Sequence, residues 1–259
     1  MCITLFLGGC GLLAEREPPA PRPPVDIEAI PDAVPRAEPP SKYGNPDSYV
    51  IDGQRYMVMK TATGYIERGI ASWYGEEFHG KRSSSGELYD MYKMTAAHRT
   101  LPIPCYVEVT NLHNGRRAVL RVNDRGPFKD NRIIDLSYVA ARKLGIWQNG
   151  TGLVAVRVID PVHPEAVPVP VAITRVAAAS AASLPFFLQV GAFFDRANAE
   201  RLRAQLLQVV SNVRVSPAES NGQAVYRVQI GPLTSIESSD DIVGSLHRIG
   251  VRNHRVVLD

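Results

Sequence analysis

The chain has 259 residues, 45% of them hydrophobic, and is long enough for one large domain or two small ones. Its 29 Lys and Arg residues and 26 Asp and Glu residues give a formal net charge of +3, too small to indicate nucleic-acid binding. Two of the three cysteines, Cys2 and Cys10, lie so close to the N-terminus that they define no disulfide framework or metal-ligand spacing. Cys105 begins an apolar run, so we expect it to be buried and unreactive.

Residues 1–10, MCITLFLGGC, form a short apolar run that ends in small residues and Cys10. Such a run is typical of a secretory signal, although no Lys or Arg precedes it, and a chance apolar N-terminus is the alternative. The run is too short to span a bilayer as a helix. The residues LGGC resemble the lipobox of bacterial lipoproteins, which implies cleavage before Cys10 and lipidation of that residue.

Two segments have the composition of linkers. Residues 11–42 are rich in proline and poor in aromatic residues, so they are predicted to be a disordered spacer. Residues 161–184 are rich in Pro and Ala and carry few charges, which predicts a second linker. A lipid anchor followed by a spacer would hold a domain at a distance from a membrane.

Between the linkers, residues 43–160 read as a mainly β domain. Short runs rich in β-branched and aromatic residues predict strands at residues 69–74, 105–112, 116–123 and 153–160. Asn114-Gly115 is a strong hairpin signal between the second and third runs. One helix is expected in DLSYVAARKLG, capped by Asp135 or Ser137 and ended by Gly145. Many short strands with little helix favour a small β-barrel.

The last domain, residues 185–259, contains a repeated pattern: FFLQVGAF (186–193) and YRVQIGPL (226–233), each followed by a helical stretch. The first helix is expected after Asp195, with an apolar face made of Ala199, Leu202, Leu206 and Val209. Strands at 212–217 and 254–258 complete a β-α-β-β-α-β order, which predicts the ferredoxin-like, α+β arrangement. The second helix, in SIESSDDIVGSLHRIG, is unusually polar.

These residues carry a family resemblance. GIASWYGEEFHGKRSSSGELYDMYKMTAAHRTLP, VTNLHNGRRAVLRVNDRGPF and RIIDLSYVAARKLG resemble the double-psi β-barrel of the rare lipoprotein A family, and the repeated C-terminal pattern resembles a SPOR domain. The resemblance implies a six-stranded barrel and a septal peptidoglycan lytic transglycosylase. It also implies an outer-membrane lipoprotein that faces the periplasm and binds denuded glycan strands, with no metal or other cofactor.

The resemblance also implies four catalytic-site residues: Glu87, Asp90, His98 and Asp124. Cleavage of a glycosidic bond needs an acid to protonate the leaving oxygen and a group to trap the oxocarbenium-like carbon. A lytic transglycosylase can use the 6-hydroxyl of the muramic sugar for the second task, so one carboxyl group with a raised pKa suffices. Asp124, at the end of a predicted hairpin strand, is our candidate acid. Glu87 is expected to raise its pKa or to position the sugar, His98 to orient a carboxylate, and Asp90 to fix the loop that carries Glu87.

Several residues are candidates for substrate binding. Trp73 and Tyr74 can stack on sugar rings, although strand alternation turns one of the two into the core. Arg125 either pairs with Asp124, which would oppose its role as an acid, or reaches for substrate carboxylates. In the last domain, alternation turns Val228 and Ile230 inward. It leaves an open sheet face for sugars, made of Phe187, Gln189, Arg227 and Gln229.

Three other functions are weighed against this one. Both domains could bind glycan without cutting it, as a wall-binding scaffold, because a fold alone does not supply activity. An inverting hydrolase would use Asp124 and Glu87 together and leave a reducing end. The split β-α-β fold also occurs in RNA-binding domains, but the required aromatic motif is missing and the charge bias is weak, so we expect no nucleic-acid partner.

Overall fold

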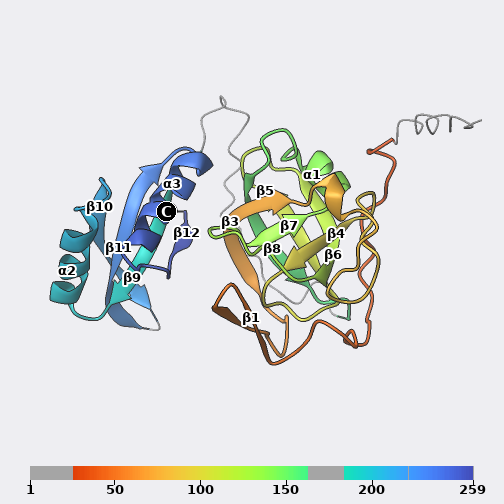
Figure 1. Ribbon diagram of the computed structural model, residues 1–259, viewed down its shortest axis with the longest axis horizontal. Coiled ribbons are helices and arrows are strands. Elements are labelled where there is room, and N and C mark those ends of the chain that lie inside the picture. The colour runs from red at the N-terminus through yellow and green to blue at the C-terminus, as the bar shows by residue number, and fades with distance from the viewer. Residues whose placement is uncertain (1–25, 163–183, 221, 259) are drawn as a thin grey trace, which may run out of the picture.

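The structure, a computed structural model, describes residues 26–162, 184–220 and 222–258. It forms two domains that lie side by side, a barrel and a smaller four-stranded sheet with helices (Figure 1). The predicted signal, Cys10 and nearly all of the second linker lie outside the described residues. Within the described part of the chain, no helix is long and apolar enough to cross a membrane.

The first domain is a closed six-stranded barrel, as predicted, with the strand order β3-β7-β4-β6-β5-β8. Strands β3 and β7 are parallel, as are β4 and β6, while the other neighbours are antiparallel. Alternate side chains such as Val107, Leu120 and Val156 are fully buried in the core. The barrel strands are β3 Ile66–Trp73, β4 Thr95–His98, β5 Cys105–Asn111, β6 Arg117–Asp124, β7 Ile134–Leu136 and β8 Gly152–Ile159.

The local signals for the hairpin and the helix are confirmed. Strands β5 and β6 pair antiparallel, and Gly115 in their connection has a φ of 73°, in the left-handed region that glycine tolerates. Helix α1 (Tyr138–Leu144) is capped by Ser137, whose side chain accepts a hydrogen bond from the Ala140 N–H, and it ends at Gly145. Asp135 is therefore not the cap and belongs to strand β7.

A two-stranded hairpin precedes the barrel and was not predicted. Strands β1 (Ser48–Ile51) and β2 (Gln54–Met57) pair antiparallel around Asp52 and Gly53, which both have positive φ. Asp-Gly between runs of β-forming residues is a hairpin signal in the sequence. A short 3-10 helix, η1 (Glu76–Phe78), follows β3.

The prediction of a disordered spacer is wrong for residues 26–42, which lie along the barrel. Ile27, Ile30 and Ala33 pack against the barrel core. The Ala33 N–H donates to the Val119 carbonyl at 3.0 Å, and Asp32 Oδ2 accepts from the Val119 N–H at 2.9 Å. The prolines keep this segment extended, and its alternate apolar and acidic side chains hold it on the surface of the barrel.

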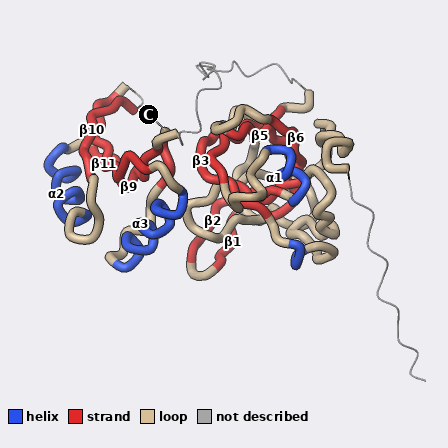
Figure 2. Tube along the Cα trace, turned by 90° about the horizontal axis from the view of Figure 1, so that it is seen from above, coloured by secondary structure: helices blue, strands red, loops and turns tan. Residues whose placement is uncertain are grey.

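The second domain is a four-stranded antiparallel sheet with the order β10-β11-β9-β12, and helices α2 and α3 cover one of its faces (Figure 2). This is the predicted ferredoxin-like arrangement. Leu188, Val228 and Ile230 are buried under the helices, as strand alternation predicted. Its elements are β9 Phe186–Phe193, α2 Arg196–Leu206, β10 Val213–Ser220, β11 Gln223–Leu233, α3 Ile236–Arg248 and β12 Arg255–Val257.

The apolar face of α2 is shorter than predicted. Ala199 and Leu206 are fully buried and Leu202 packs against the core, but the helix ends at Leu206 and Val209 is 41% exposed. Val210 takes the place at the core that Val209 was expected to fill.

The polar composition of α3 has a structural reason, since the helix packs against the barrel as well as against its own sheet. Ser239 is fully buried and bonds with the Asn131 side chain, and Asp240 binds the guanidinium of Arg132. Ile70 of the barrel is buried in the core of the second domain. The two domains are therefore joined by apolar packing as well as by polar contacts.

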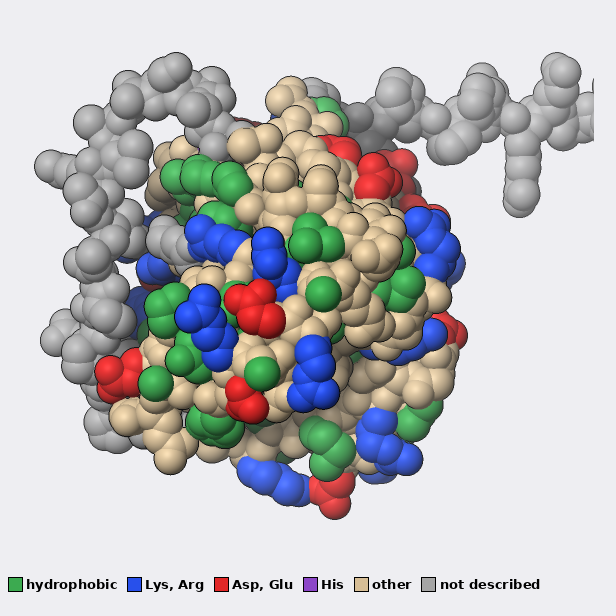
Figure 3. Space-filling model, turned by 90° about the vertical axis from the view of Figure 1, so that its left-hand side faces the viewer, with side chains coloured by type: hydrophobic (Ala, Val, Ile, Leu, Met, Phe, Trp, Pro, Cys, Tyr) green, Lys and Arg blue, Asp and Glu red, His purple; other side chains and the backbone are tan. Residues whose placement is uncertain are grey.

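The outer face of the second domain carries both signs of charge. Lys and Arg side chains are spread among Asp and Glu side chains over the described part of this face (Figure 3). No continuous basic stripe, of the kind that follows a nucleic-acid backbone, is seen there.

Candidate active site

Two carboxylates lie in one row across four neighbouring barrel strands. Ser72 on β3 is paired with Asp135 on β7, Asp135 with Ala97 on β4, and Ala97 with Asp124 on β6. Laterally paired residues point to the same side of a sheet, so these side chains share one face. Two inter-strand steps put the Cα atoms of the two acids about 10 Å apart. Ala97, between them, has too small a side chain to separate the carboxyl groups.

One oxygen of Asp124 is held by three donors. Its Oδ1 accepts from the Ser84 N–H at 2.7 Å, the Ser84 hydroxyl at 2.6 Å and the Arg125 N–H at 2.7 Å. Hydrogen bonds of this kind favour a carboxylate and fix its orientation. The loop SSSGE (83–87) thereby positions the predicted catalytic residue.

Neither Arg121 nor Arg125, the arginines closest to Asp124 in the sequence, forms an ion pair with it. Arg125 is 8% exposed, and its guanidinium donates to the carbonyls of Gly44, His98 and Leu101. Burial lowers the pKa of Arg125, and its side chain holds backbone segments together. The predicted role of Arg125 in reaching substrate carboxylates is therefore wrong, because the guanidinium is turned inward.

Asp135 is the carboxyl group with the raised pKa that an acid needs. Burial is the main cause, and the negative charge of Asp124 acts in the same direction. The Ser72 hydroxyl donates to it, and the charges of Arg132 and Arg99 oppose the rise. Gly126, at φ 140°, turns the chain beside it, and a Cβ on this glycine would lie 3.6 Å from Asp135 Oδ2.

Sequence reasoning missed Asp135 as a site residue, since it was taken as a possible cap of the helix expected in DLSYVAARKLG. A signal was present: Asp135 alternates with the apolar residues Ile134 and Leu136, as an outward residue of a strand does.

Trp73, the last residue of β3, lies on the core side, and Tyr74, which follows it, lies on the site side. Trp73 is paired with the buried Leu136 and packs against the barrel core, so its predicted stacking on sugar is not supported. The Tyr74 hydroxyl is buried beside Asp124. Burial raises its pKa, and the charges of Asp124 and Asp135 raise it further. The hydroxyl therefore stays protonated and faces both acids.

The Glu87 carboxylate is bound by side chains other than the two acids. Its carboxylate accepts from Arg121 Nη1 at 2.9 Å and from Asn123 Nδ2 at 2.8 Å. Arg121 also binds Glu38 of the N-terminal segment, with Nε 2.9 Å from Oε1. Burial raises the pKa of Glu87, but its bonds with Arg121 and Asn123 outweigh this and lower it. Glu87 is therefore ionised, and its carboxylate is bound by Arg121 and Asn123 and not by Asp124.

His98 is 3% exposed and does not orient a carboxylate directly. Its Nδ1 accepts from the N–H groups of Thr100 and Leu101 at 3.2 and 3.0 Å. The proton therefore sits on Nε2, which donates to the Tyr65 hydroxyl at 2.8 Å. Burial, followed by the charges of Arg99 and Arg125, lowers the pKa of His98 to about 3, so the ring stays neutral and serves the structure.

Asp90 closes a turn of its own. Its Oδ1 accepts from the Tyr92 N–H at 3.0 Å and lies 3.8 Å from His79 Nδ1. No contact between Asp90 and Glu87 is found among the described residues. Asp90 thus shapes the loop between η1 and β4 without touching the two acids.

The predicted sugar-binding face of the second domain is largely closed. Phe187, Gln189 and Gln229 are 7%, 7% and 1% exposed. The Arg214 guanidinium lies 3.7 Å from the centre of the Phe187 ring and donates to Gln229 at 3.0 Å. The prediction of an open face is wrong for these three residues, while Arg227 stays half-buried.

Within the described residues, no group of three or more His, Cys, Asp or Glu side chains is arranged to hold a metal ion. Burial raises the pKa of the half-buried Cys105 thiol to about 12. This thiol therefore stays protonated at physiological pH.

Comparisons with known proteins agree with this architecture. The family model described as lytic transglycolase matches residues 66–158, and the SPOR domain model matches residues 182–254. The endolytic peptidoglycan transglycosylase RlpA of Vibrio cholerae is 41% identical over 250 residues, which cover 95% of this chain and 89% of the relative. The protein of the same name from Pseudomonas aeruginosa is 40% identical over 278 residues, covering 88% and 80%.

Among solved structures, the RlpA SPOR domain from Pseudomonas aeruginosa matches with 31% identity and a TM-score of 0.28. The match covers 29% of this chain and 99% of that domain.

Proposed function

The chain belongs to the RlpA family of lytic transglycosylases, and from that premise we propose that it cleaves peptide-free peptidoglycan strands with formation of a 1,6-anhydro end. The bond cut is the β-1,4 bond between N-acetylmuramic acid and N-acetylglucosamine. The observation that carries the proposal is the pair Asp124 and Asp135, which flank Ala97 in one row and differ in environment.

The environments assign different roles to the two acids. Asp135, with its raised pKa, holds a proton and gives it to the glycosidic oxygen as the bond to C1 breaks. Asp124 presents a carboxylate fixed by Ser84, and its charge stabilises the oxocarbenium-like carbon. The sequence predicted Asp124 as the acid, and the raised pKa of Asp135 supports giving this role to Asp135 instead.

The second half of the reaction needs no water. The 6-hydroxyl of the muramic sugar attacks C1, its proton passes to Asp124, and the new C1–O6 bond closes the anhydro ring. Proton exchange between the two carboxyl groups restores the starting state. Tyr74, whose hydroxyl faces both acids, positions the sugar or the proton between them.

The decisive experiment is mass analysis of the products from purified peptide-free glycan. We expect anhydro ends with the parent chain, and a loss of at least 100-fold in rate with Asp135→Asn or Asp124→Asn, as is typical when a general acid or base is removed. Asp241→Asn, at an exposed position on α3, is the matched control and should keep full activity. Hydrated ends would favour a hydrolase, and glycan retained without products would favour a scaffold.

We also propose that the protein is an outer-membrane lipoprotein that faces the periplasm and acts at the division septum. The LGGC motif and the Pro-rich residues that follow support this proposal. Labelled palmitate should enter the parent chain and not a Cys10→Ser variant. A fluorescent fusion should lose any septal enrichment when residues 185–259 are deleted.

A further inference from the structure

Residues 38–45 lie against the loop that holds Asp124, although the matching family model of the barrel begins only at residue 66. Pro39 and Pro40 follow Glu38, and their fixed φ angles keep this part of the segment extended. The segment reaches loop 83–87 at both of its ends, directly at one and through an arginine at the other.

At its C-terminal end the segment touches Ser84, which gives Asp124 two of its hydrogen bonds. A Cβ on Gly44 would lie 2.9 Å from the Ser84 carbonyl oxygen, and the φ of Gly44 is 84°, so only glycine fits there without strain. The Ser41 hydroxyl donates to the Ser85 carbonyl at 3.3 Å. The two backbones therefore pack directly on each other, and the place of Ser84 depends on that of Gly44.

The same end of the segment holds Arg125, whose N–H is the remaining donor to Asp124. Arg125 Nε donates to the Gly44 carbonyl at 2.8 Å, and Nη2 donates to Asn45 Oδ1 at 3.1 Å. Asn45 is itself bound to the backbone of Ile103, through its Nδ2 at 2.6 Å and its Oδ1 at 2.9 Å. All three hydrogen bonds to Asp124 Oδ1 thus come from residues that Gly44 or Asn45 contacts.

At its N-terminal end the segment reaches the far side of the loop through Arg121. Glu38 accepts from Arg121 Nε at 2.9 Å and from Nη2 at 3.0 Å. Nη1 of the same guanidinium donates to both oxygens of Glu87, at 3.0 and 2.9 Å. Charge-assisted bonds of this kind fix the orientation of the groups they join. The loop is therefore held at Glu87 as well as at Ser84.

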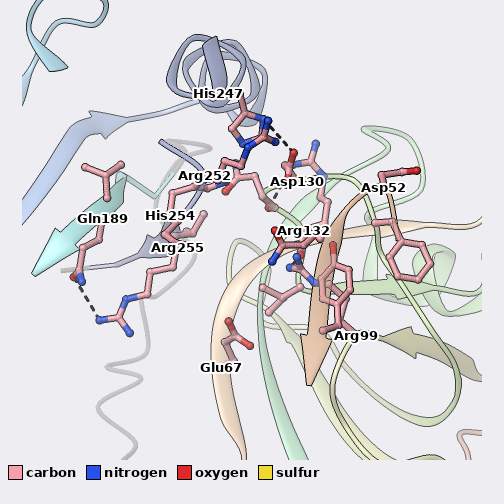
Figure 4. A pocket seen from close by; sticks show the side chains of 18 of the residues that line it. Asp52, Glu67, Arg99, Asp130, Arg132, Gln189, His247, Arg252, His254 and Arg255 are labelled. Atoms are coloured by element: carbon pink, nitrogen blue, oxygen red, sulfur yellow. Dashed lines mark hydrogen bonds and ion pairs between the residues drawn. The ribbon is translucent and has the colours of Figure 1, made fainter. Parts of the chain in front are cut away.

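The segment acts within the barrel and not through the domain junction. A cavity of about 540 Å³ lies at that junction, where Asp130 faces His247 (Figure 4), and none of residues 38–45 lines it. A change at Gly44 should therefore leave the docking of the second domain intact.

We propose that residues 38–45 are a positioning element of the transglycosylase site, which fixes loop 83–87 and thereby the carboxylate of Asp124. The inference rests on the proposed function and deepens it, because it extends the functional unit of the barrel upstream of residue 66. A carboxylate that is fixed before the substrate arrives stabilises developing charge without having to reorient. Loss of the element should slow the chemical step and leave substrate binding nearly unchanged.

The test uses the full chain with Gly44→Ala, whose methyl group would displace Ser84. Gly150→Ala is the matched control, since its φ of 73° is also strained for alanine but a Cβ there has open space. On peptide-free glycan we expect kcat of the Gly44 variant to fall at least about tenfold, because a shift of about 1 Å in a catalytic group can cost about 100-fold. KM should stay within about twofold of the parent, and the control should keep both constants.

The new methyl group would also meet the buried side chain of Ile103, at its Cδ1. Adding Ile103→Val to Gly44→Ala removes this second clash and keeps the clash with Ser84. The double variant should therefore stay as slow as Gly44→Ala. Recovery of kcat would overturn the proposal, since the loss would then come from the barrel core.

Amide hydrogen exchange reports the same placement without any reaction. The N–H groups of Ser84 and Arg125 each donate to Asp124 at 2.7 Å. Both should exchange faster in Gly44→Ala, while the amides of strand β5 in the same barrel stay as protected as in the parent. The Gly150→Ala control should leave both N–H groups protected. Unchanged protection in Gly44→Ala overturns the positioning element.

The two proposals fail in different ways. Anhydro products from the parent together with full kcat in Gly44→Ala refute the positioning element alone. A parent that forms no products refutes the proposed function, and the exchange of the two N–H groups then decides by itself whether residues 38–45 position Asp124.

Discussion

Arg132 of the barrel and Asp240 of helix α3 form a two-point ion pair, with Nη1 2.8 Å from Oδ1 and Nη2 2.6 Å from Oδ2. The Arg132 side chain is 2% exposed, so this guanidinium is buried in the domain junction. Lys129 adds a second cation 3.2 Å from Asp240, and bonding with the two cations outweighs burial and lowers the pKa of Asp240. One carboxylate of the second domain thus neutralises a buried cation beside the catalytic row.

The first prediction concerns docking. Asp240→Ala leaves Arg132 buried without its partner, which should cost about 3 kcal/mol. We expect the domains to separate and calorimetry to show two independent unfolding transitions where the parent shows coupled ones. Asp241→Ala, the exposed neighbour on α3, is the control and should behave as the parent. Coupled unfolding of the Asp240 variant at the temperature of the parent would contradict the prediction.

The second prediction concerns pH. In the proposed reaction, cleavage needs protonated Asp135, so activity should fall as pH rises through the raised pKa of this group. Arg132 lowers that pKa, and Arg132→Gln should therefore move the alkaline limb of kcat/KM to higher pH. Asp240→Asn leaves the charge of Arg132 less neutralised and should move the same limb to lower pH. If both variants moved the alkaline limb of kcat/KM in the same direction, this electrostatic account would be wrong.

The raised pKa of Asp135 also has a consequence for stability. Its ionised form is disfavoured in the folded state, so the folded chain binds its proton more tightly than the unfolded chain does. Asp135→Asn should therefore be more stable than the parent above the folded pKa, and this gain should shrink as the pH falls through that pKa. Chemical denaturation at several pH values measures the difference, and a variant less stable than the parent at neutral pH would argue against it.

The third prediction concerns the N-terminal segment. The bond with Arg121 is the main reason why the pKa of Glu38 is lowered to about 2. Its stabilising contribution should be present above the ordinary value of 4.5 and lost as the pH falls towards about 2. Glu38→Gln should loosen residues 26–42 and speed their proteolysis at neutral pH. Glu28→Gln, at an exposed position, should leave the rate unchanged.

The fourth prediction tests whether His98 has a structural role or a role in proton transfer. With its pKa lowered to about 3, the ring should show no NMR titration between pH 5 and pH 8. His98→Ala leaves the N–H groups of Thr100 and Leu101 without their acceptor, which should cost about 2 kcal/mol or more of unfolding free energy. A titration near pH 6.5 would restore His98 as a candidate for proton transfer.

The sequence predicted correctly those elements that are determined by their own residues. Asn114-Gly115 specifies a hairpin, Ser137 and Gly145 delimit α1, and alternation along β11 separates Val228 from Gln229. The family resemblance supplied the barrel topology, which pairs β4 with β7 and β6 across long stretches of chain. Strands β4 and β7 are too short to give a periodic signal of their own.

The parts that sequence reasoning missed depend on tertiary contacts. The pKa of Asp135 is raised because the residue is buried and lies near Asp124, and this placement follows from the barrel register. Gln189 and Gln229 are polar in the sequence, yet neighbouring side chains cover them in the sheet. Residues 26–42 have the composition of a spacer, but Glu38 meets Arg121, which lies far along the chain.

The connection from β6 to β7 constrains how the two domains can be recombined. Its two flanking strands carry Asp124 and Asp135, the proposed catalytic pair, and within it Asn131 and Arg132 bond with Ser239 and Asp240 of α3. A foreign SPOR domain grafted onto this barrel would need its own counterparts of Ser239 and Asp240, or it would leave two buried polar side chains unsatisfied. The barrel and its SPOR domain therefore have to be exchanged together, although the linker between them has the composition of a domain boundary.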